Sequence, residues 1–344
     1  MKYLSVCSGI EAASVAWGSL GWQAVGFSEI EPFCCELLKQ RFPDVANFGD
    51  MTSYKEWNIE KGTVELLVGG TPCQSFSISG LREGLADDRG NLALTFCNIA
   101  NHFKPRWILW ENVPGVLSSN RGRDFGIFLG AMGQLGYGFA YRVLNAQFWG
   151  VAQRRSRVFV VGYLGDWRPP AAVLFDSESL QRNVKKTKRK KHKSSESGEK
   201  GTKEPVALSG LQMFLGVGRN IAPALKRKHQ GLVAYSIAGN AINRSVEQGG
   251  NGRRVSDDVC YTLTSTDRHA VVANYRVRFY TPLECERLQG FPDNWTKVIY
   301  NGKSAKDTPR YRAIGNSMPV PVMRWLGERI EYVERLMKEI KKGD

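Results

Sequence analysis

The first thirty residues, MKYLSVCSGIEAASVAWGSLGWQAVGFSEI (1–30), contain the pattern that decides the fold. The run 3–7 is short and apolar and ends in a turn at Ser8-Gly9, and a predicted helix follows from 11 to 20. A second apolar run, 24–28, ends at Glu29. A strand, a helix and a second strand in this order are typical of a βαβ unit with parallel strands.

The same alternation continues through the first half of the chain. Residues 32–41 form a predicted helix, and three further apolar runs, at 64–68, 107–110 and 158–161, are predicted strands. The sequence therefore predicts an α/β fold built on a doubly wound, mostly parallel sheet. Such sheets bind ligands at the carboxyl ends of their strands, where several of these runs are followed by polar residues. An amphipathic helix at 320–341 closes the pattern.

Charge is the unusual feature of the composition. The chain of 344 residues has 48 Lys and Arg against 33 Asp and Glu, which gives a net charge of +15 and a pI near 9.5. Of this excess, +9 falls within 164–274, where 19 basic residues outnumber 10 acidic ones. A basic excess favours a polyanionic partner such as a nucleic acid, although a merely basic soluble protein has the same composition.

Composition also divides the chain into three predicted parts, an α/β part, a Gly-, Asn-, Ser- and Arg-rich part, and a second compact apolar part. These parts are 1–163, 164–274 and 275–344. The middle part contains short strand-like runs at 231–237 and 259–263. Residues 182–193 hold eight Lys or Arg and no acid, and small polar residues follow to 201. The segment 182–201 is therefore predicted to be flexible, either as a linker or in contact with a DNA backbone.

Cysteine usage and hydropathy argue against several classes of protein. The seven cysteines show no CxxC spacing, which disfavours a disulfide framework and a zinc site and favours a reducing cytoplasm. We expect no metal. We also expect no signal peptide, because Glu11 interrupts the apolar N-terminus, and no membrane span, because no run approaches ~18 apolar residues.

One cysteine has a setting that suits catalysis. Cys73 follows the strand 64–68 inside the turn Gly69-Gly70-Thr71-Pro72-Cys73-Gln74-Ser75-Phe76-Ser77. A reactive thiolate needs partial exposure and an electropositive setting, and the end of a strand provides both. Cys73 is therefore the predicted nucleophile. Cys7, Cys34 and Cys97 lie in apolar contexts that favour packing.

An acid stands in a comparable position. Glu111 directly follows the strand 107–110, where apolar neighbours would raise its pKa and let it donate a proton. Taken alone, an acid in this position is more often a helix cap or an ion-pair partner. Its place at the end of a strand, like that of Cys73, favours a catalytic role.

Three polar side chains precede the strand 158–161. Gln153, Arg155 and Arg157 share one face, because alternate residues of an extended segment point the same way. Arginines aimed together into a cleft suit a phosphate or a base carbonyl. For Arg154, on the other face, we expect a plain surface position.

Taken in order, these segments resemble the motifs of the bacterial and phage DNA cytosine-5 methyltransferase family. Residues 72–77 resemble the nucleophile motif, 111–113 the acid motif and 153–157 the arginine motif, and a late and a last motif resemble 278–293 and 315–317. The resemblance covers about 1–163 and 275–335. It implies a Rossmann-like catalytic domain into which 164–274 is inserted as a smaller, irregular, β-rich target-recognition domain.

The resemblance also implies S-adenosylmethionine as the cofactor. Glu29 stands where the family's acid binds the ribose hydroxyls, and Asp50 stands where it reaches the adenine. The residues expected to bind the cofactor are Cys7, Ser8, Gly9, Ile10, Glu29, Ile30, Asp50, Met51, Pro72, Asn316 and Ser317. The chain departs from the family pattern at Glu11 and Ala12, where two glycines are common, and at Cys7, which replaces a Phe.

The family chemistry implies a role for each catalytic residue. The Cys73 thiolate adds to C6 of a flipped-out cytosine, Glu111 contacts N3 and the exocyclic amine, and Arg155 and Arg157 hold the ring oxygen and a nearby phosphate. The residues expected to contact DNA are Gln74, Ser75, Ser77, Ser79, Gln153, Arg244, Arg253, Arg254 and Arg268. The expected enzyme is a monomer acting on double-stranded DNA in the cytoplasm, at the nucleoid, with a cognate restriction endonuclease encoded elsewhere.

Three other functions are weighed against this one. An RNA methyltransferase with similar chemistry is disfavoured because the basic insertion suits duplex DNA. A nicotinamide-dependent dehydrogenase is disfavoured because no GxGxxG follows the first strand. A non-catalytic DNA-binding protein is disfavoured because Cys73, Glu111 and Arg157 are all present.

Overall fold

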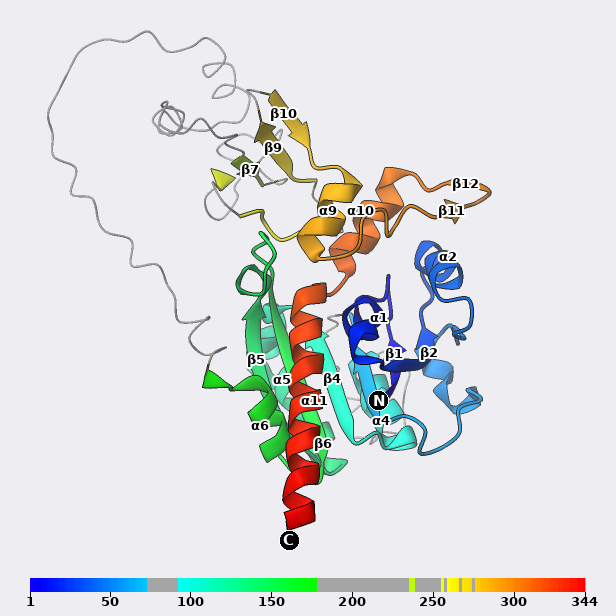
Figure 1. The fold of residues 1–344 in the computed structure, drawn as a ribbon, viewed down its shortest axis with the longest axis vertical. Coiled ribbons are helices and arrows are strands. Elements are labelled where there is room, and N and C mark those ends of the chain that lie inside the picture. Colours follow the sequence, from blue (N-terminus) through cyan, green and yellow to red (C-terminus); the bar gives the residue numbers. More distant parts are fainter. Residues whose placement is uncertain are drawn as a thin grey trace, which may run out of the picture.

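A six-stranded sheet forms the centre of the larger part of the molecule (Figure 1). The computed structural model describes residues 1–72, 92–177, 235–238, 255–256, 259–265, 268–273 and 276–343. The strand order is β2-β1-β3-β4-β6-β5, and the first three neighbouring pairs are parallel. The strands are β1 (Lys2–Val6), β2 (Gln23–Ser28), β3 (Leu66–Gly69), β4 (Trp107–Asn112), β5 (Tyr137–Asn145) and β6 (Ser156–Leu164). The predicted doubly wound, mostly parallel α/β fold is confirmed.

Helices cover both faces of this sheet. One face packs on α1, α6 and α11, and the other packs on α4 and α5. The helices of this part are α1 (Ala12–Trp17), α2 (Pro32–Arg41), α4 (Leu92–Phe103), α5 (Arg123–Gln134), α6 (Arg168–Leu174) and α11 (Val320–Gly343). The short 3-10 turns are η1 (Gly18–Leu20), η2 (Met51–Glu56), η4 (Pro114–Leu117), η5 (Ser119–Gly122) and η6 (Ala146–Phe148).

The alternation of side chains along the central strands explains the two layers. In β4, Trp107 and Leu109 enter one core and Ile108 and Trp110 enter the other. All four are fully buried, as a central strand covered on both faces requires. The indole N–H of Trp107 donates to Glu334 on α11 at 2.6 Å, so burial of this ring leaves no unsatisfied donor.

The direction of β6 positions the candidate site. β6 runs antiparallel to β4, with Asn112 opposite Val158, and antiparallel to β5. The amino end of β6 therefore lies at the same edge as the carboxyl ends of β1 to β4. The polar residues that precede β6 and those that follow the parallel strands are thereby brought to one edge of the sheet.

A second, four-stranded antiparallel sheet lies with α9 and α10 at the end of the molecule opposite the C-terminus (Figure 1). Its strands, in spatial order, are β10 (Arg276–Phe279), β9 (Ala270–Ala273), β7 (Tyr235–Ile237) and β8 (Val255–Ser256). The remaining elements are α9 (Pro282–Gln289), α10 (Asp307–Asn316) and the ribbon of β11 (Ile299–Tyr300) and β12 (Lys303–Ser304). Pro282 begins α9 behind a capping box, in which Thr281 and Glu284 each bond the other's backbone N–H.

Several predicted elements correspond to observed ones, and one does not. The predicted helix 32–41 has the bounds of α2, and the run 231–237 overlaps β7. The run 259–263 is not a strand, because only Cys260 forms an isolated parallel bridge, with Gln153.

The three-part division of the chain remains a prediction. α6, whose sequence lies within 164–274, packs on β5, β6 and α11 of the main sheet. The basic segment 182–201 lies outside the described residues. None of the described helices combines the length and the apolar character that a membrane crossing would need.

Candidate active site

A cavity of about 660 Å³ opens at the carboxyl edge of the main sheet. Its volume is within the range of about 300–1,000 Å³ that is usual for small-molecule sites. The lining comes from the ends of β1, β2, β3 and β4, from the residues before β6, and from α10. The predicted site residues that line it are Cys7, Gly9, Glu29, Ile30, Asp50, Met51, Pro72, Glu111, Arg155, Arg157 and Asn316.

The loop after β1 wraps one wall of this cavity. Cys7, Gly9 and Glu11 all have positive φ, at 49°, 58° and 60°, so alternate residues reverse the chain direction. The loop is closed by the Glu11 N–H, which donates to Ser8 O at 3.0 Å. Gly9 N–H donates to the Glu29 carboxylate at 2.7 Å, which ties the loop to the end of β2.

Glu29 is held in place by three backbone amides. One carboxylate oxygen accepts from Gly9, and the other accepts from Ile30 at 2.9 Å and from Glu31 at 2.8 Å. The Asn47 side chain fixes the Glu29 backbone from the other side, with bonds of 3.0 and 3.1 Å. A carboxylate fixed in this way offers its remaining lone pairs to a ligand hydroxyl without having to reorganise.

An apolar surface lies beside this carboxylate. The side chain of Ile30 is 69% exposed and borders the cavity, whereas Met51 is buried. Asp50 begins η2 and accepts from Thr52 N at 2.9 Å. Apolar side chains can pack against the face of a flat ring, and an acid beside them can accept a hydrogen bond from the polar edge of that ring.

The Cys7 thiol lies deeper in the same wall and points to Met51, with 3.5 Å between the two sulfurs. Burial raises the pKa of Cys7 to about 12, and the nearby charges of Glu29 and Asp50 act in the same direction. Cys7 therefore remains a neutral thiol at physiological pH, which suits packing and does not suit nucleophilic attack.

Glu11 is buried beneath the loop and lines a smaller adjoining cavity of about 40 Å³. Its carboxylate accepts from Ser5 Oγ at 2.9 Å, from Ser14 Oγ at 3.0 Å and from Ser14 N at 3.1 Å, so it also caps α1. Burial raises the pKa of Glu11 to about 7, although these three bonds oppose the shift. Glu11 is thus an integral support of the loop after β1.

We expect Glu11→Gln to flatten the pH dependence of stability. The folded protein holds the Glu11 proton up to about pH 7, whereas an ordinary Glu loses it near 4.5. The contribution of Glu11 to the free energy of unfolding should therefore be greatest below pH 4.5, fall as pH rises to about 7, and then level off, a change of about 3 kcal/mol. Thermal melts of both proteins at pH 5, 6, 7 and 8 measure this. A variant that lost stability over pH 5–7 as steeply as the wild type would contradict the assignment.

Glu111 and Arg157 form an ion pair in the floor of the cavity. Arg157 Nε lies 3.0 Å from Glu111 Oε1, and both side chains are largely buried. Burial raises the pKa of Glu111, while the charges of Arg157 and Arg155 oppose the shift. The carboxyl group can therefore hold a proton at a higher pH than an ordinary Glu, as a proton donor requires.

The turn after β3 is fixed against this acid. Asn112 Nδ2 donates to Thr71 O, and Trp110 Nε1 donates to Thr71 Oγ1, each at 3.0 Å. A Cβ atom on Gly70 would lie 3.0 Å from Glu111 Oε2 and 3.0 Å from Met318 Cε. Glycine lets the backbone approach the Glu111 carboxylate closely, and a larger residue would require the side chain of Glu111 or Met318 to shift. The described part of this turn ends at Pro72, which also lines the cavity.

The predicted site residues that do not border the main cavity lie in several places, and one of them, Arg268, lines a separate pocket of about 10 Å³. Ser8 and Ser317 border the smaller cavity, and Ile10 is in the core. Gln153 is fully buried, and its amide donates to Leu288 O at 3.1 Å. The residues that lie outside the described part of the chain are Cys73, Gln74, Ser75, Ser77, Ser79, Arg244, Arg253 and Arg254. Their proposed roles remain predictions.

The cavity also includes residues that the sequence did not single out. These are Ser28, Glu31, Cys34, Gly49, Thr52, Gly70, Thr71, Leu92, Asn112, Val113, Arg312, Ala313 and Gly315. Most of them are neighbours of predicted site residues. Their position next to the end of a strand is therefore the sequence feature that could have predicted them. Leu92 begins α4, and nothing in the local sequence marks it.

Comparisons with known proteins agree on one family. A family model described as C-5 cytosine-specific DNA methylase matches residues 1–332. The type II methyltransferase M.DsaV of Dactylococcopsis salina is 27% identical, over 100% of this chain and 90% of that protein. The solved structure of the Dnmt2 methyltransferase of S. pombe aligns with a TM-score of 0.60 at 18% identity, over 97% of this chain and 99% of that one, which shows the same fold.

One relative has a different name. A DNA N-6-adenine-methyltransferase of Escherichia phage P1 is 34% identical over 98% of this chain. The chain spans only 62% of the length of that phage protein, so part of the relative has no counterpart here.

Proposed function

The chain belongs to the C-5 cytosine-specific DNA methylase family, and from that premise we propose that it methylates C5 of a flipped-out cytosine in duplex DNA through a Cys73 adduct. One observation carries the proposal: the buried Glu111–Arg157 pair lies in the same cavity as Pro72, the residue before Cys73. An acid, a cation and a nucleophile-bearing turn are the groups that this reaction needs.

The residues of the cavity fit S-adenosylmethionine as the cofactor. Glu29, fixed by three amides, would accept from the ribose hydroxyls, and Asp50 with Ile30 and Met51 would hold the adenine. The Gly9 loop and Asn316 also line the cavity and would hold the methionine part. When bound, the cofactor supplies an electrophilic methyl group.

The residues of this chain activate the base. Cytosine C5 is too weak a nucleophile to take a methyl group directly, so the Cys73 thiolate first adds to C6. Glu111 stabilises the resulting enamine through N3 and the exocyclic amine, and Arg157 bonds the ring oxygen. After C5 is methylated, loss of the C5 proton and β-elimination of the thiolate restore the aromatic ring and free Cys73.

The burial of Glu111 supports base flipping as part of the proposal. The side chain of this acid is only 10% exposed, so a base stacked in a duplex could not reach it. The target base must leave the helix, at a cost of a few kcal/mol. The net charge of +15 supports binding to the DNA backbone, and we assign sequence recognition to 164–274, which includes Arg244, Arg253 and Arg254.

Adenine methylation is the second candidate, and the name of the phage P1 relative is its support. The exocyclic amine of adenine can take a methyl group without prior activation, so that reaction gives Cys73 no role. The presence of Cys73 in the sequence, directly after Pro72 in the cavity lining, therefore favours cytosine. The monomeric state, the cytoplasmic location at the nucleoid and a cognate endonuclease belong to the same proposal and depend on its outcome.

Base-resolution sequencing tests the proposal. DNA from cells expressing this chain should contain 5-methylcytosine in one short sequence motif, and DNA from cells expressing Cys73→Ser should not. The same DNA should contain no added N6-methyladenine. Adenine methylation in both samples would favour the second candidate, and methylation found only in RNA would replace DNA as the substrate.

A further inference from the structure

Arg155, which the sequence assigns to the base, is enclosed by the protein itself. It is 1% exposed, and its guanidinium donates to Leu263 O at 2.8 Å, to Gly315 O at 3.1 Å and to Ser317 O at 2.7 Å. We call these three acceptors the carbonyl clamp. They come from two parts of the chain, the segment 259–265 and the end of α10. Arg155 therefore joins the start of β6 to both.

A backbone contact brings the same two parts together. A Cβ atom on Gly315 would lie 2.3 Å from the carbonyl carbon and oxygen of Thr264 and 2.7 Å from Ser265 N. Backbone atoms cannot move aside as a flexible side chain can. Within a helix, alanine is ordinarily favoured over glycine by about 1 kcal/mol. Glycine at 315 is therefore explained by the close approach of α10 to 264–265.

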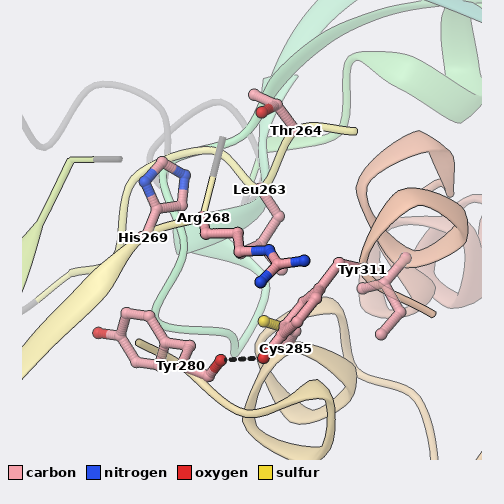
Figure 2. A pocket seen from close by; sticks show the side chains of 8 residues that line it. Leu263, Thr264, Arg268, His269, Tyr280, Cys285 and Tyr311 are labelled. Carbon is pink, nitrogen blue, oxygen red and sulfur yellow. Dashed lines mark hydrogen bonds between the residues drawn. The ribbon is translucent and has the colours of Figure 1, made fainter. Parts of the chain in front are cut away.

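A second connection closes the outer side of this junction (Figure 2). The Arg268 guanidinium lies over the Tyr311 ring, 5.2 Å from its centroid, and donates to Thr308 Oγ1 at 3.0 Å. The Tyr311 hydroxyl donates to Tyr280 O. The space left between these side chains is only about 10 Å³, so the junction is packed. Arg268, which the sequence assigns to DNA, here holds the segment before β9 against α10.

The other side of α10 borders the cofactor cavity. Arg312, Ala313, Gly315 and Asn316 all line it. One ten-residue helix therefore contacts both the cavity and the described segments 259–265 and 268–269. A helix is stiff over ten residues, so a shift of those segments is transmitted to Asn316.

We propose that Arg155 and Gly315 are positioning residues that couple DNA binding to cofactor binding, and that Arg155 does not touch the target base. The inference rests on the proposed function, because it takes the cavity as the cofactor site and 259–269 as part of the DNA-reading region. The planar guanidinium reaches three carbonyls at once, which a lysine ammonium on a longer stem cannot reproduce. Coupling of this kind is typically 5- to 150-fold in affinity.

Calorimetry with S-adenosylhomocysteine tests the coupling. Its Kd is measured with and without sheared genomic DNA for the wild type, Arg155→Lys and Gly315→Ala. We expect the wild-type Kd to fall about tenfold when DNA is present, and the ratio of the two Kd values to approach one in both variants. The ratio within each protein is the readout, because Arg155 and Gly315 also line the cavity and their substitution changes the Kd without DNA as well. Arg142→Lys is the matched control, because Arg142 is buried on β5 and donates to Leu174 O far from the cavity. It should keep the wild-type ratio.

The outcomes separate the two proposals. If S-adenosylhomocysteine does not bind the wild type, the proposed function is wrong and this inference falls with it. If it binds and the ratio is unity in the wild type, or tenfold in both variants, only the inference is overturned. Hydrogen exchange of the wild type with DNA alone needs no variant: protection of 307–316 supports the coupling, and unchanged exchange there contradicts it.

Discussion

Cys73→Ser is expected to reduce methyl transfer by about 10⁴-fold or more, since removing the nucleophile of a covalent hydrolase has cost about 10⁶-fold. A serine hydroxyl is neutral at pH 7 and adds poorly to C6, whereas an ordinary thiol already gives about a few per cent of the strongly nucleophilic thiolate. The turn after β3 should survive the change, because its contacts to Trp110 and Asn112 involve Thr71 and not residue 73. Transfer of labelled methyl groups to genomic DNA measures the loss.

A covalent trap makes this result specific. In DNA with 5-fluorocytosine, fluorine replaces the C5 proton that must leave before the thiolate can be expelled. The wild type should therefore form a complex with this DNA that survives denaturing electrophoresis, and Cys73→Ser should form none. Cys97→Ala is the matched control, because Cys97 is buried in α4 and burial raises its pKa above the ordinary thiol range. A complex formed by Cys73→Ser but not by Cys97→Ala would assign the nucleophile to Cys97.

Most of the central sheet is readable from the sequence because its strands contain apolar runs bounded by turns, whereas β5, which includes Arg142 and Asn145, was not predicted. The β4 core residues Trp107 to Trp110 are buried on both faces, and an uninterrupted apolar run is the expected pattern for such a strand. Glu111 and Glu29 each follow such a run directly, so their convergence at one edge follows from the parallel arrangement. The fold class and the acids at the cavity can therefore be predicted from local sequence patterns alone.

The direction of β6 is not readable in that way. An apolar run has the same composition whether the strand lies parallel or antiparallel, yet only the antiparallel direction brings Arg157 to Glu111. The resemblance to a family placed the two in one site, and alternation along the strand placed Arg155 beside Arg157. Neither feature shows that the Arg155 guanidinium donates hydrogen bonds to three backbone carbonyls, because Leu263 and Gly315 are more than 100 residues away in the sequence.

Glycines illustrate the same limit. Gly70 and Gly315 both have ordinary backbone conformations, so no turn signal marks them, and their need for glycine comes from neighbours distant in the sequence. The boundaries of the proposed recognition region are also hard to predict from sequence. Composition separates 164–274 from the rest of the chain, but it does not show that α6, at the start of that range, packs on the main sheet. Which of Arg244, Arg253 and Arg254 reads a base stays a prediction.

Glu111→Gln is expected to reduce turnover by about 10²- to 10⁴-fold, the usual contribution of a general acid or base. Glutamine keeps the shape of the side chain but cannot hold or release the proton that the enamine chemistry requires. S-adenosylhomocysteine should bind with nearly unchanged Kd, because the proposal assigns the cofactor to Glu29 and Asp50 and the target base to Glu111. Glu334→Gln is the matched control, since Glu334 is buried and accepts from Trp107 outside the site. It should retain wild-type turnover.

The pH profile then distinguishes proton donation from packing. Burial raises the pKa of Glu111, so wild-type turnover should decline at high pH as this carboxyl loses its proton. Glu111→Gln should lack that decline in its residual activity. Arg157→Ala should move the decline to higher pH, because the cation that favours the ionised carboxylate is gone, even though loss of the ring-oxygen contact lowers turnover at every pH. A decline that stayed at the same pH in both variants would belong to another group, and Glu111 would then be a structural partner of Arg157 alone.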